Sequence, residues 1–323
     1  MLTPRFVVWM VPVAMLISGA DVASSEDYPT KPIRLMVTQA PGSGMDIMAR
    51  LVGRKLTDAW GQQVVVDNRP GGGGNIGGEI AAKAAPDGYT LMIVTSSTAI
   101  AHVLFEKLNY NLIKDFSPIS LLATIPFVLV VHPSVAATSV KELIALAKTR
   151  PGKVLYGSSG SGSGMHFAAE IFKTMTGTDL VHVPYKGTSA VLVDVMGGRV
   201  QLAFVVVSAV LPAIKGSKVR ALGVSSLKRT ALVPDLPAIS ESIVGYEVIG
   251  WYGLVAPAGT PDEVISRLSG ELAKALKTSE FREQLSRRGV EPVGTTPNDF
   301  GSFMESQIRK YRQAVRDAGM RVE

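Results

Sequence analysis

The sequence contains no cysteine, and this absence removes several classes of site. Disulfide bonds, thiolate metal sites and lipid attachment at a cysteine are excluded. Histidine is also scarce, and the four histidines are not spaced as metal ligands: His102, His132, His166 and His182. We therefore expect neither a zinc site nor any other metal or cofactor.

Concentrated charge is lacking as well. The chain has 33 Lys and Arg against 27 Asp and Glu, a net charge of +6, and the basic residues are spread along it. No basic stripe is interleaved with aromatic residues, which make up only 7% of the chain. This pattern argues against nucleic-acid binding and is weakly in favour of an anionic small ligand.

Long apolar runs are confined to the N-terminus. Arg5 precedes an apolar stretch from Phe6 to Ile17, and small residues follow at Ser18-Gly19-Ala20. This order is typical of an export signal spanning residues 1–20, with cleavage after Ala20 or, as the second choice, Ser24. An uncleaved membrane anchor is the alternative, but the apolar stretch is shorter than the roughly 20 residues of a spanning helix.

Apolar periodicity alternates between strand and helix along the rest of the chain. Strands are expected at Ile33 to Val37, Gln63 to Asp67, Leu91 to Val94, Phe127 to His132, Val154 to Tyr156, Leu180 to Val183, Val200 to Val207, Arg220 to Val224 and Trp251 to Ala256. Helices are expected at Asp46 to Trp60, Ile76 to Ala85, Val140 to Thr149, from about Met165, Ser189 to Met196, Pro261 to Leu276, Glu280 to Arg287 and Asn298 to Ala318. Asp46, Asn75 and Ser139 are expected to cap helices. The order predicts an α/β fold with doubly wound, mostly parallel sheets.

The length of 323 residues suits two domains. A break near residues 120–127 and a return near 245–255 predict two lobes joined by two crossings. Lobe 1 would comprise residues 28–124 and 248–323, and lobe 2 residues 125–247. Two crossings permit a hinge, and a hinge around a cleft suits ligand capture.

Two strand-to-helix junctions are built alike, one in each expected lobe. The first contains Pro41-Gly42-Ser43-Gly44 and the second runs from Gly157 to Gly164. Small residues leave backbone N–H groups accessible at the positive end of a helix, where anions bind. Ser96-Ser97-Thr98 and Tyr185-Lys186-Gly187-Thr188 follow two further strands. We expect an anion to be held between the lobes, although Lys186 is equally consistent with a solvated surface residue.

Enzyme signatures are weak. Met165-His166 stands where a phosphate-binding Walker loop needs Lys followed by Ser or Thr, and the glycines of the second junction do not have dinucleotide-binding spacing. Gly162-Ser163-Gly164 also lacks the full nucleophile-elbow pattern, in which glycines stand two residues before and two residues after the serine. A secreted serine hydrolase using Ser161 or Ser163 with His166 remains the less favoured alternative.

The mature sequence resembles the periplasmic solute receptors of tripartite tricarboxylate transporters, also called Bug receptors. The resemblance rests on Tyr28-Pro29-Thr30-Lys31-Pro32-Ile33-Arg34, Asp67-Asn68-Arg69-Pro70-Gly71, Ala84-Ala85-Pro86-Asp87-Gly88-Tyr89-Thr90, Val183-Pro184-Tyr185-Lys186-Gly187 and Trp251-Tyr252-Gly253-Leu254. It implies a two-lobe Venus-flytrap fold in the periplasm, which closes on a small organic carboxylate. It also implies integral-membrane permease subunits as partners, and we expect a monomer without catalytic turnover.

The junctions and the resemblance together indicate the residues that bind the ligand. They are Gln39, Ser43, Gly44, Ser96, Ser97, Thr98, Ser161, Ser163, His166, Tyr185, Thr188, Val205 and Val206. The serines and glycines are equally typical of turns and caps, and Trp251 and Tyr252 are expected in the core or between the lobes.

Two departures from the family pattern bear on the ligand. Thr38-Gln39-Ala40-Pro41-Gly42-Ser43 replaces a proline-rich segment, and Val205-Val206 stands where many members carry an acidic residue that could face an ammonium group. The resemblance therefore favours an apolar-bodied carboxylate, such as the aromatic dicarboxylate terephthalate, over an amino acid. Alternatives are that these valines only finish a buried strand, that the ligand is a citrate-like acid, or that the receptor serves sensing.

Overall fold

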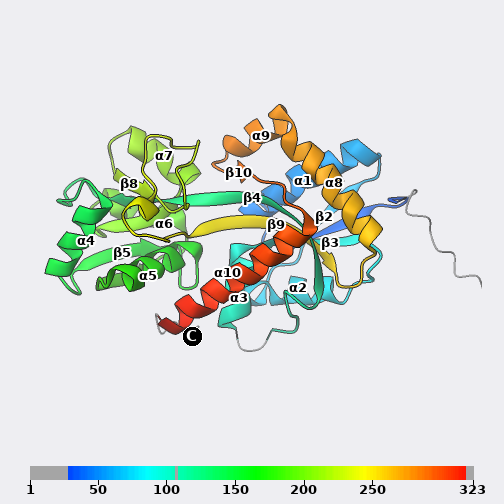
Figure 1. Cartoon of the computed structure of the whole chain (residues 1–323), viewed down its shortest axis with the longest axis horizontal. Coiled ribbons are helices and arrows are strands. Elements are labelled where there is room, and N and C mark those ends of the chain that lie inside the picture. Colours follow the sequence, from blue (N-terminus) through cyan, green and yellow to red (C-terminus); the bar gives the residue numbers. More distant parts are fainter. Residues whose placement is uncertain (1–27, 106–107, 318–323) are drawn as a thin grey trace, which may run out of the picture.

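The computed structural model describes residues 28–105 and 108–317, which form two α/β lobes lying side by side (Figure 1). The expected signal segment, residues 1–20, lies outside the described residues. The two-lobe α/β fold is the one that the sequence predicted. Within the described part of the chain, no helix is both long enough and apolar enough to cross a bilayer.

Lobe 1 contains a mixed sheet with the strand order β2-β1-β3-β9-β4 and with β10 paired to β4. The strands are β1 (Ile33–Val37), β2 (Val64–Asn68), β3 (Thr90–Thr95), β4 (Phe116–Val131), β9 (Ile249–Pro257) and β10 (Glu291–Pro292). The helices are α1 (Gly44–Trp60), α2 (Asn75–Ala82), α3 (Ser96–Leu104), α8 (Asp262–Lys277) and α9 (Ser279–Ser286), with a 3-10 turn η2 (Gly72–Gly74). β1, β2 and β3 are parallel, and β9 is antiparallel to its neighbours.

Lobe 2 repeats this arrangement around the second half of β4. The strands are β5 (Val154–Ser158), β6 (Leu180–Pro184), β7 (Leu202–Val206) and β8 (Arg220–Val224). The helices are α4 (Val140–Thr149), α5 (Gly164–Thr176), α6 (Thr188–Met196) and α7 (Val207–Lys215), with a 3-10 turn η3 (Ile239–Glu241). β5 runs parallel to β6 and β7, while β4 runs antiparallel to both β7 and β8.

Two long strands connect the lobes. β4 pairs with β9 up to Pro126 and with β7 and β8 from Phe127 onward, so one continuous strand belongs to both sheets. Buried Ser225 stabilises the crossing, because its hydroxyl accepts from Phe127 N at 2.8 Å and donates to Val248 O at 2.5 Å. The sequence predicted only the lobe 2 half of β4, since Ser117, Pro118, Ser120, Thr124 and Pro126 interrupt the apolar pattern of the first half.

α10 (Pro297–Asp317) contacts both lobes. It lies across α3 and β4 and reaches α5 (Figure 1). Tyr311 of α10 packs edge-to-face against Phe167 of α5 with the ring centroids 5.5 Å apart. Buried aromatic side chains therefore support the junction of the lobes as well as the two cores.

α1 and α5 begin and end in the same way, which confirms the likeness of the two junctions. Ser43 and Ser163 are their N-caps and accept from the N–H groups of Asp46 and His166. Both helices end at a glycine in the left-handed region, a conformation that costs glycine little.

Some local predictions were wrong. Asp46 is not the cap of α1; its Oδ2 accepts from Gly42 N at 2.9 Å, and Arg50 and this bond hold its pKa below the usual value. Asn75 is the first residue of α2 and instead accepts from Asn109 N at 3.0 Å. Ser139 does cap α4 as predicted. The helices α3 and α7 were missed, because hydroxyl residues open the first and β-branched valines the second.

Candidate functional site

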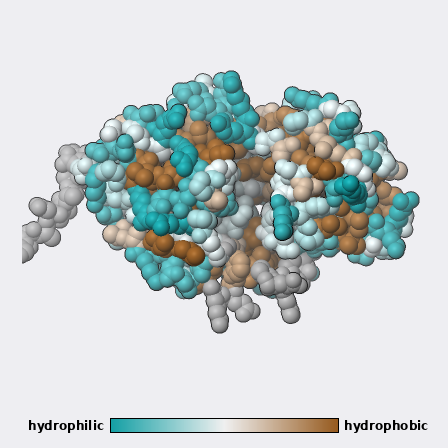
Figure 2. All heavy atoms as spheres, turned by 180° about the vertical axis from the view of Figure 1, so that it is seen from behind, coloured by the Kyte–Doolittle hydropathy of each residue, from teal (hydrophilic) through white to brown (hydrophobic). Residues whose placement is uncertain are grey.

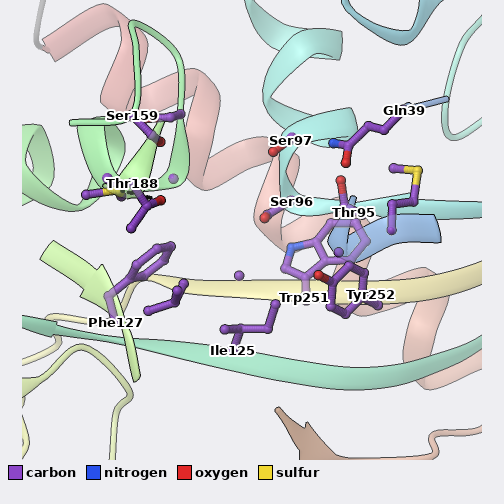
Figure 3. Close-up of a pocket in the computed structure, with 17 residues that line it drawn as sticks. Gln39, Thr95, Ser96, Ser97, Ile125, Phe127, Ser159, Thr188, Trp251 and Tyr252 are labelled. Atoms are coloured by element: carbon purple, nitrogen blue, oxygen red, sulfur yellow. Dashed lines mark hydrogen bonds between the residues drawn. The ribbon is translucent and has the colours of Figure 1, made fainter. Parts of the chain in front are cut away.

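A cavity of about 200 Å³ lies between the lobes, where the molecular surface is indented (Figures 2 and 3). Its lining consists of Gln39, Gly44, Met45, Thr95, Ser96, Ser97, Ile125, Phe127, Ser159, Ser163, Gly164, Met165, Thr188, Val206, Gly250, Trp251 and Tyr252. None of these seventeen described residues is charged. A ligand here would meet neutral hydrogen-bonding groups and apolar surface.

Five helices begin at this cavity, namely α1, α3, α5, α6 and α7. The first N–H groups of a helix have no acceptor within that helix, and they form the positive end of its dipole. The N-caps of α6 and α7, Gly187 and Val206, provide no side-chain acceptor. The helix dipoles thus direct positive potential into a cavity whose described lining contains no cationic side chain.

The hydrogen bonds at the start of α3 explain why Ser96 and Ser97 line the cavity and Thr98 does not. Thr95 and Thr98 form a reciprocal capping box, in which Thr98 N donates to Thr95 Oγ1 at 3.3 Å and Thr95 N donates to Thr98 Oγ1 at 3.1 Å. Thr98 is therefore turned inward and does not line the cavity, whereas Ser96 and Ser97 do (Figure 3). The capping box thus accounts for the absence of Thr98 from the lining of this cavity.

The caps of α1 and α5 differ in their access to the cavity. Ser43 Oγ accepts from Asp46 N at 3.2 Å, and it is the following Gly44 that lines the cavity. Ser163 Oγ accepts from His166 N at 3.3 Å while Ser163 itself remains part of the lining.

Tyr252 contributes a hydroxyl at the wall of the cavity (Figure 3). Burial raises the pKa of Tyr252 to about 12, so the phenol stays protonated near neutral pH and can donate a hydrogen bond. Trp251 is fully buried beside it and packs edge-to-face on Phe300 and Phe303. Trp251 thus belongs to the core, Tyr252 is partly buried and packs against the core, and both also line the cavity.

His166 lies beneath the loop that joins β5 to α5, and it does not line the cavity. Its ring stacks on His182 with the centroids 4.0 Å apart, and Gly162 N donates to its Nδ1 at 3.1 Å. Burial, followed by the neighbouring His182, lowers the pKa of His166 to about 4. His166 is therefore neutral near pH 7, and its 4.0 Å separation from Glu170 is not an ion pair there.

A small buried network surrounds this histidine pair. Ser158 Oγ lies 2.6 Å from His182 Nε2, the Tyr156 hydroxyl donates to Glu170, and Lys173 Nζ donates to Glu170 Oε1 at 2.8 Å. The imidazole of His166 supports the backbone of the loop and is not aligned with a serine hydroxyl. This geometry does not match the serine-hydrolase alternative.

Three further predicted residues lie away from the cavity. The Tyr185 hydroxyl donates to Asp194 Oδ2 at 2.7 Å, and Asp194 pairs with Arg199 at 2.5 Å. Ser161 is exposed between two glycines with positive φ. Val205 is fully buried in β7 opposite Val128, so its placement in the cavity wall was wrong.

The structure thus brings seven of the thirteen predicted residues to the cavity: Gln39, Gly44, Ser96, Ser97, Ser163, Thr188 and Val206. The remaining six do not line it: Ser43 and Thr98 take part in helix caps, His166 and Tyr185 have partners elsewhere, Val205 is in the core and Ser161 is exposed on its loop. Sequence reasoning did not assign the other ten to the ligand: Met45, Thr95, Ile125, Phe127, Ser159, Gly164, Met165, Gly250, Trp251 and Tyr252. Among these, Ser159 and Gly164 carried a signal, since they belong to the Gly/Ser run of the second junction, and Trp251 and Tyr252 were expected only in the core or between the lobes.

Comparison with known proteins identifies the family. The model of the tripartite tricarboxylate transporter family receptor matches residues 48–320. BugT of Bordetella pertussis is 35% identical over 319 residues, which cover 96% of this chain and 97% of the relative. A Pseudomonas sp. strain P51 protein, described as "UPF0065 protein in tcbD-tcbE intergenic region", is 34% identical over 307 residues, covering 94% and 91% respectively.

Solved structures agree with this assignment. Rpa4515 of R. palustris with adipate superposes with a TM-score of 0.77 at 35% identity, covering 91% of this chain and 99% of the relative. MatC of Rhodopseudomonas palustris with bound malate has a TM-score of 0.72 at 27% identity, covering 89% and 100%. The chain belongs to the tripartite tricarboxylate transporter receptor family, whose members are binding proteins and not enzymes.

Proposed function

We propose that this protein is a periplasmic receptor that captures a small organic carboxylate between its lobes. It delivers the ligand to the integral-membrane permease subunits of a tripartite transporter. The observation that carries the proposal is the convergence of five helix N-termini on a cavity whose described lining has no charged side chain. Such a site favours an anion without needing an arginine or a metal ion.

The energetics of this site suit a transport receptor. A hydrogen bond to a charged group contributes about 1.5 to 3 kcal/mol, and a micromolar complex needs about 8 kcal/mol. The first-turn N–H groups that do not donate to a cap, the hydroxyl of Ser97 and the phenol of Tyr252 are available as donors. Several of them around one carboxylate approach that value, and burial of the apolar body of the ligand adds to it.

The chemistry of the relatives favours a carboxylate over other anions, since one carries adipate and another malate. The apolar wall formed by Ile125, Phe127 and Val206 favours a ligand with an apolar body, such as terephthalate. No acidic residue among the described lining can face an ammonium group, which disfavours an amino acid. Citrate-like acids are the alternative class.

Capture would occur by closure of the lobes. Residues 28–124 and 248–323 would move as one body and residues 125–247 as the other, with the hinge at the crossing of β4 and β9. Ligand release to the permease would then follow reopening of the lobes.

Thermal-shift screening of the mature protein tests this function. The panel contains aliphatic di- and tricarboxylates, aromatic mono- and dicarboxylates and amino acids, with hits confirmed by calorimetry. We expect selective stabilisation by at least one carboxylate, because a ligand that binds only the folded state raises the melting temperature. Stabilisation by citrate-like acids or amino acids alone would leave the receptor function standing and overturn the preference for an apolar-bodied ligand, whereas no stabilisation by any compound would overturn the receptor function.

A further inference from the structure

A second cavity adjoins the first and extends the space available to a ligand. Its volume is about 370 Å³, and it shares Gly44, Ile125, Val206 and Tyr252 with the first cavity. We refer to the first as the proximal cavity and to the second as the distal cavity. The shared residues place the two cavities next to each other between the lobes.

The distal cavity is mainly apolar. α1 contributes Ile47, Met48 and Leu51, while Leu285 and Val290 close the side next to α9. Ile47 is 39% exposed, which leaves a large apolar side chain without a protein partner over much of its surface. Binding of an apolar ligand group over this surface is favourable, because it removes apolar area from water.

One charged residue lines this apolar space among the described residues, and it is Arg288. Its Nη1 donates to Gln284 O at 2.8 Å, and no carboxylate of the described residues is ion-paired with it. The preceding Arg287 does have such a partner, since its Nη2 lies 2.7 Å from Glu283 Oε1. Arg288 thus has guanidinium donors available for a carboxylate supplied by a ligand.

The backbone holds Arg288 at the seam between the lobes. Gly289, the next residue, has φ +67°, and a Cβ at this position would lie 2.7 Å from Ser208 N of α7. The turn after α9 in lobe 1 is therefore packed directly on the start of α7 in lobe 2. Because Ser208 also lines the distal cavity, this contact places Arg288 where both lobes surround a bound ligand.

We infer that the ligand is an apolar-bodied diacid that spans both cavities. One carboxylate binds at the helix N-termini of the proximal cavity, the body lies against Ile125, Val206 and Tyr252, and the second acid group binds Arg288. This inference rests on the proposed carboxylate-receptor function and assigns the substrate class. Arg288 becomes the residue that distinguishes a diacid from a monoacid of the same body.

Calorimetry with matched acids tests this assignment, with terephthalate against benzoate and adipate against hexanoate as probes. For at least one pair, we expect the wild-type protein to bind the diacid at least tenfold more tightly than the monoacid. Arg288→Met should reduce the diacid affinity about tenfold and change the monoacid affinity less than twofold. Arg287→Met is the matched control, since that arginine is paired with Glu283 outside the cavity, and it should change neither affinity.

A second variant tests the distal cavity independently of charge. Ile47→Trp places a larger side chain into the apolar space from the first turns of α1. It should weaken terephthalate or adipate at least fivefold and leave a shorter acid such as malate nearly unaffected. Thermal unfolding without ligand checks that each variant is folded.

The outcomes distinguish failure of the Arg288 assignment from failure of the receptor function. If the wild-type protein binds diacids but Arg288→Met weakens diacid and monoacid equally, or neither, the distal assignment is overturned and the receptor function stands. If no acid binds the wild-type protein, the receptor function itself fails and the distal assignment fails with it.

Discussion

Gly44 lies so close to Tyr252 that a Cβ on Gly44 would be 2.4 Å from the tyrosine hydroxyl oxygen. Real Cβ contacts do not occur at this distance, so any side chain at position 44 displaces the ring. The pair joins the first turn of α1 to β9 at the wall that the two cavities share. The absence of a side chain at Gly44 therefore sets the position of a phenol donor.

Gly44→Ala tests this relationship. Gly44 is the first residue of α1 and does not have a positive φ, so alanine is compatible with its backbone. We expect the displaced Tyr252 ring to weaken carboxylate binding about tenfold, with at most about 2 kcal/mol of lost stability from overpacking. Gly270→Ala in α8 is the control, because no atom lies within 4 Å of a Cβ there. Unchanged affinity in Gly44→Ala, measured by calorimetry, would contradict the role of this pair.

The adjacent valines of β7 should respond to the same substitution in opposite ways. Val206 is the N-cap of α7 and has no side-chain cap, so Val206→Asp adds an acceptor that stabilises helices by about 1 kcal/mol. The same carboxylate repels an anionic ligand in the proximal cavity. We expect a melting temperature that is equal to or above the wild-type value, together with at least tenfold weaker binding.

Val205→Asp is the partner experiment. Val205 is fully buried, and an unpaired charge there costs several kcal/mol, so we expect a large loss of stability in urea unfolding. A stable Val205→Asp protein would show that this side chain is not inside the strand as described.

The buried histidine pair predicts a loss of stability in acid. Burial lowers the pKa of His166 to about 4, whereas an unfolded histidine has a pKa near 6.5. The unfolded state therefore binds more protons below pH 6.5. The contribution of His166 to stability is complete above pH 6.5 and is lost as the pH falls toward 4, with a magnitude of roughly 3 kcal/mol.

The groups that face His166 are His182, Glu170 and Lys173, and burial lowers the pKa of His182 as well. His166→Asn retains an acceptor near Gly162 N and removes the titrating ring. Urea unfolding at pH 7 and pH 5 should show a smaller loss of stability for His166→Asn than for the wild-type protein. His132→Asn leaves both stacked rings in place and should behave like the wild-type protein; an equal pH dependence in all three proteins would contradict this account.

The sequence predicted most elements because apolar periodicity and caps act locally. Ser139, for example, carries its capping signal next to the helix that it begins, and it caps α4 as predicted. β4 was only half predicted because Pro118 and Pro126 lie in a strand whose pairing is set by β9, more than 100 residues away in sequence. Local pattern contains no information about such a distant partner.

The candidate site was predictable where function depends on backbone exposure, as at Gly44 and Ser97. Val205 and Val206 could not be told apart from the sequence. Successive residues of a strand point to opposite faces, so a shift of one position decides whether a side chain lies in the core or lines the cavity. Nor could local pattern show that Tyr185 has a partner in Asp194. Ile125 and Phe127 have the apolar character of core residues, and only the crossing of β4 brings them to the cavity.

We propose that a cavity whose described lining is uncharged binds an anion through helix N-termini. The most direct test is calorimetric titration of the mature protein with adipate, terephthalate and malate, each compared with its uncharged diamide. We predict micromolar or tighter binding of at least one acid, and at least 100-fold weaker binding of the corresponding diamide. Equal affinity for an acid and its diamide, or no binding of any acid, would contradict the claim.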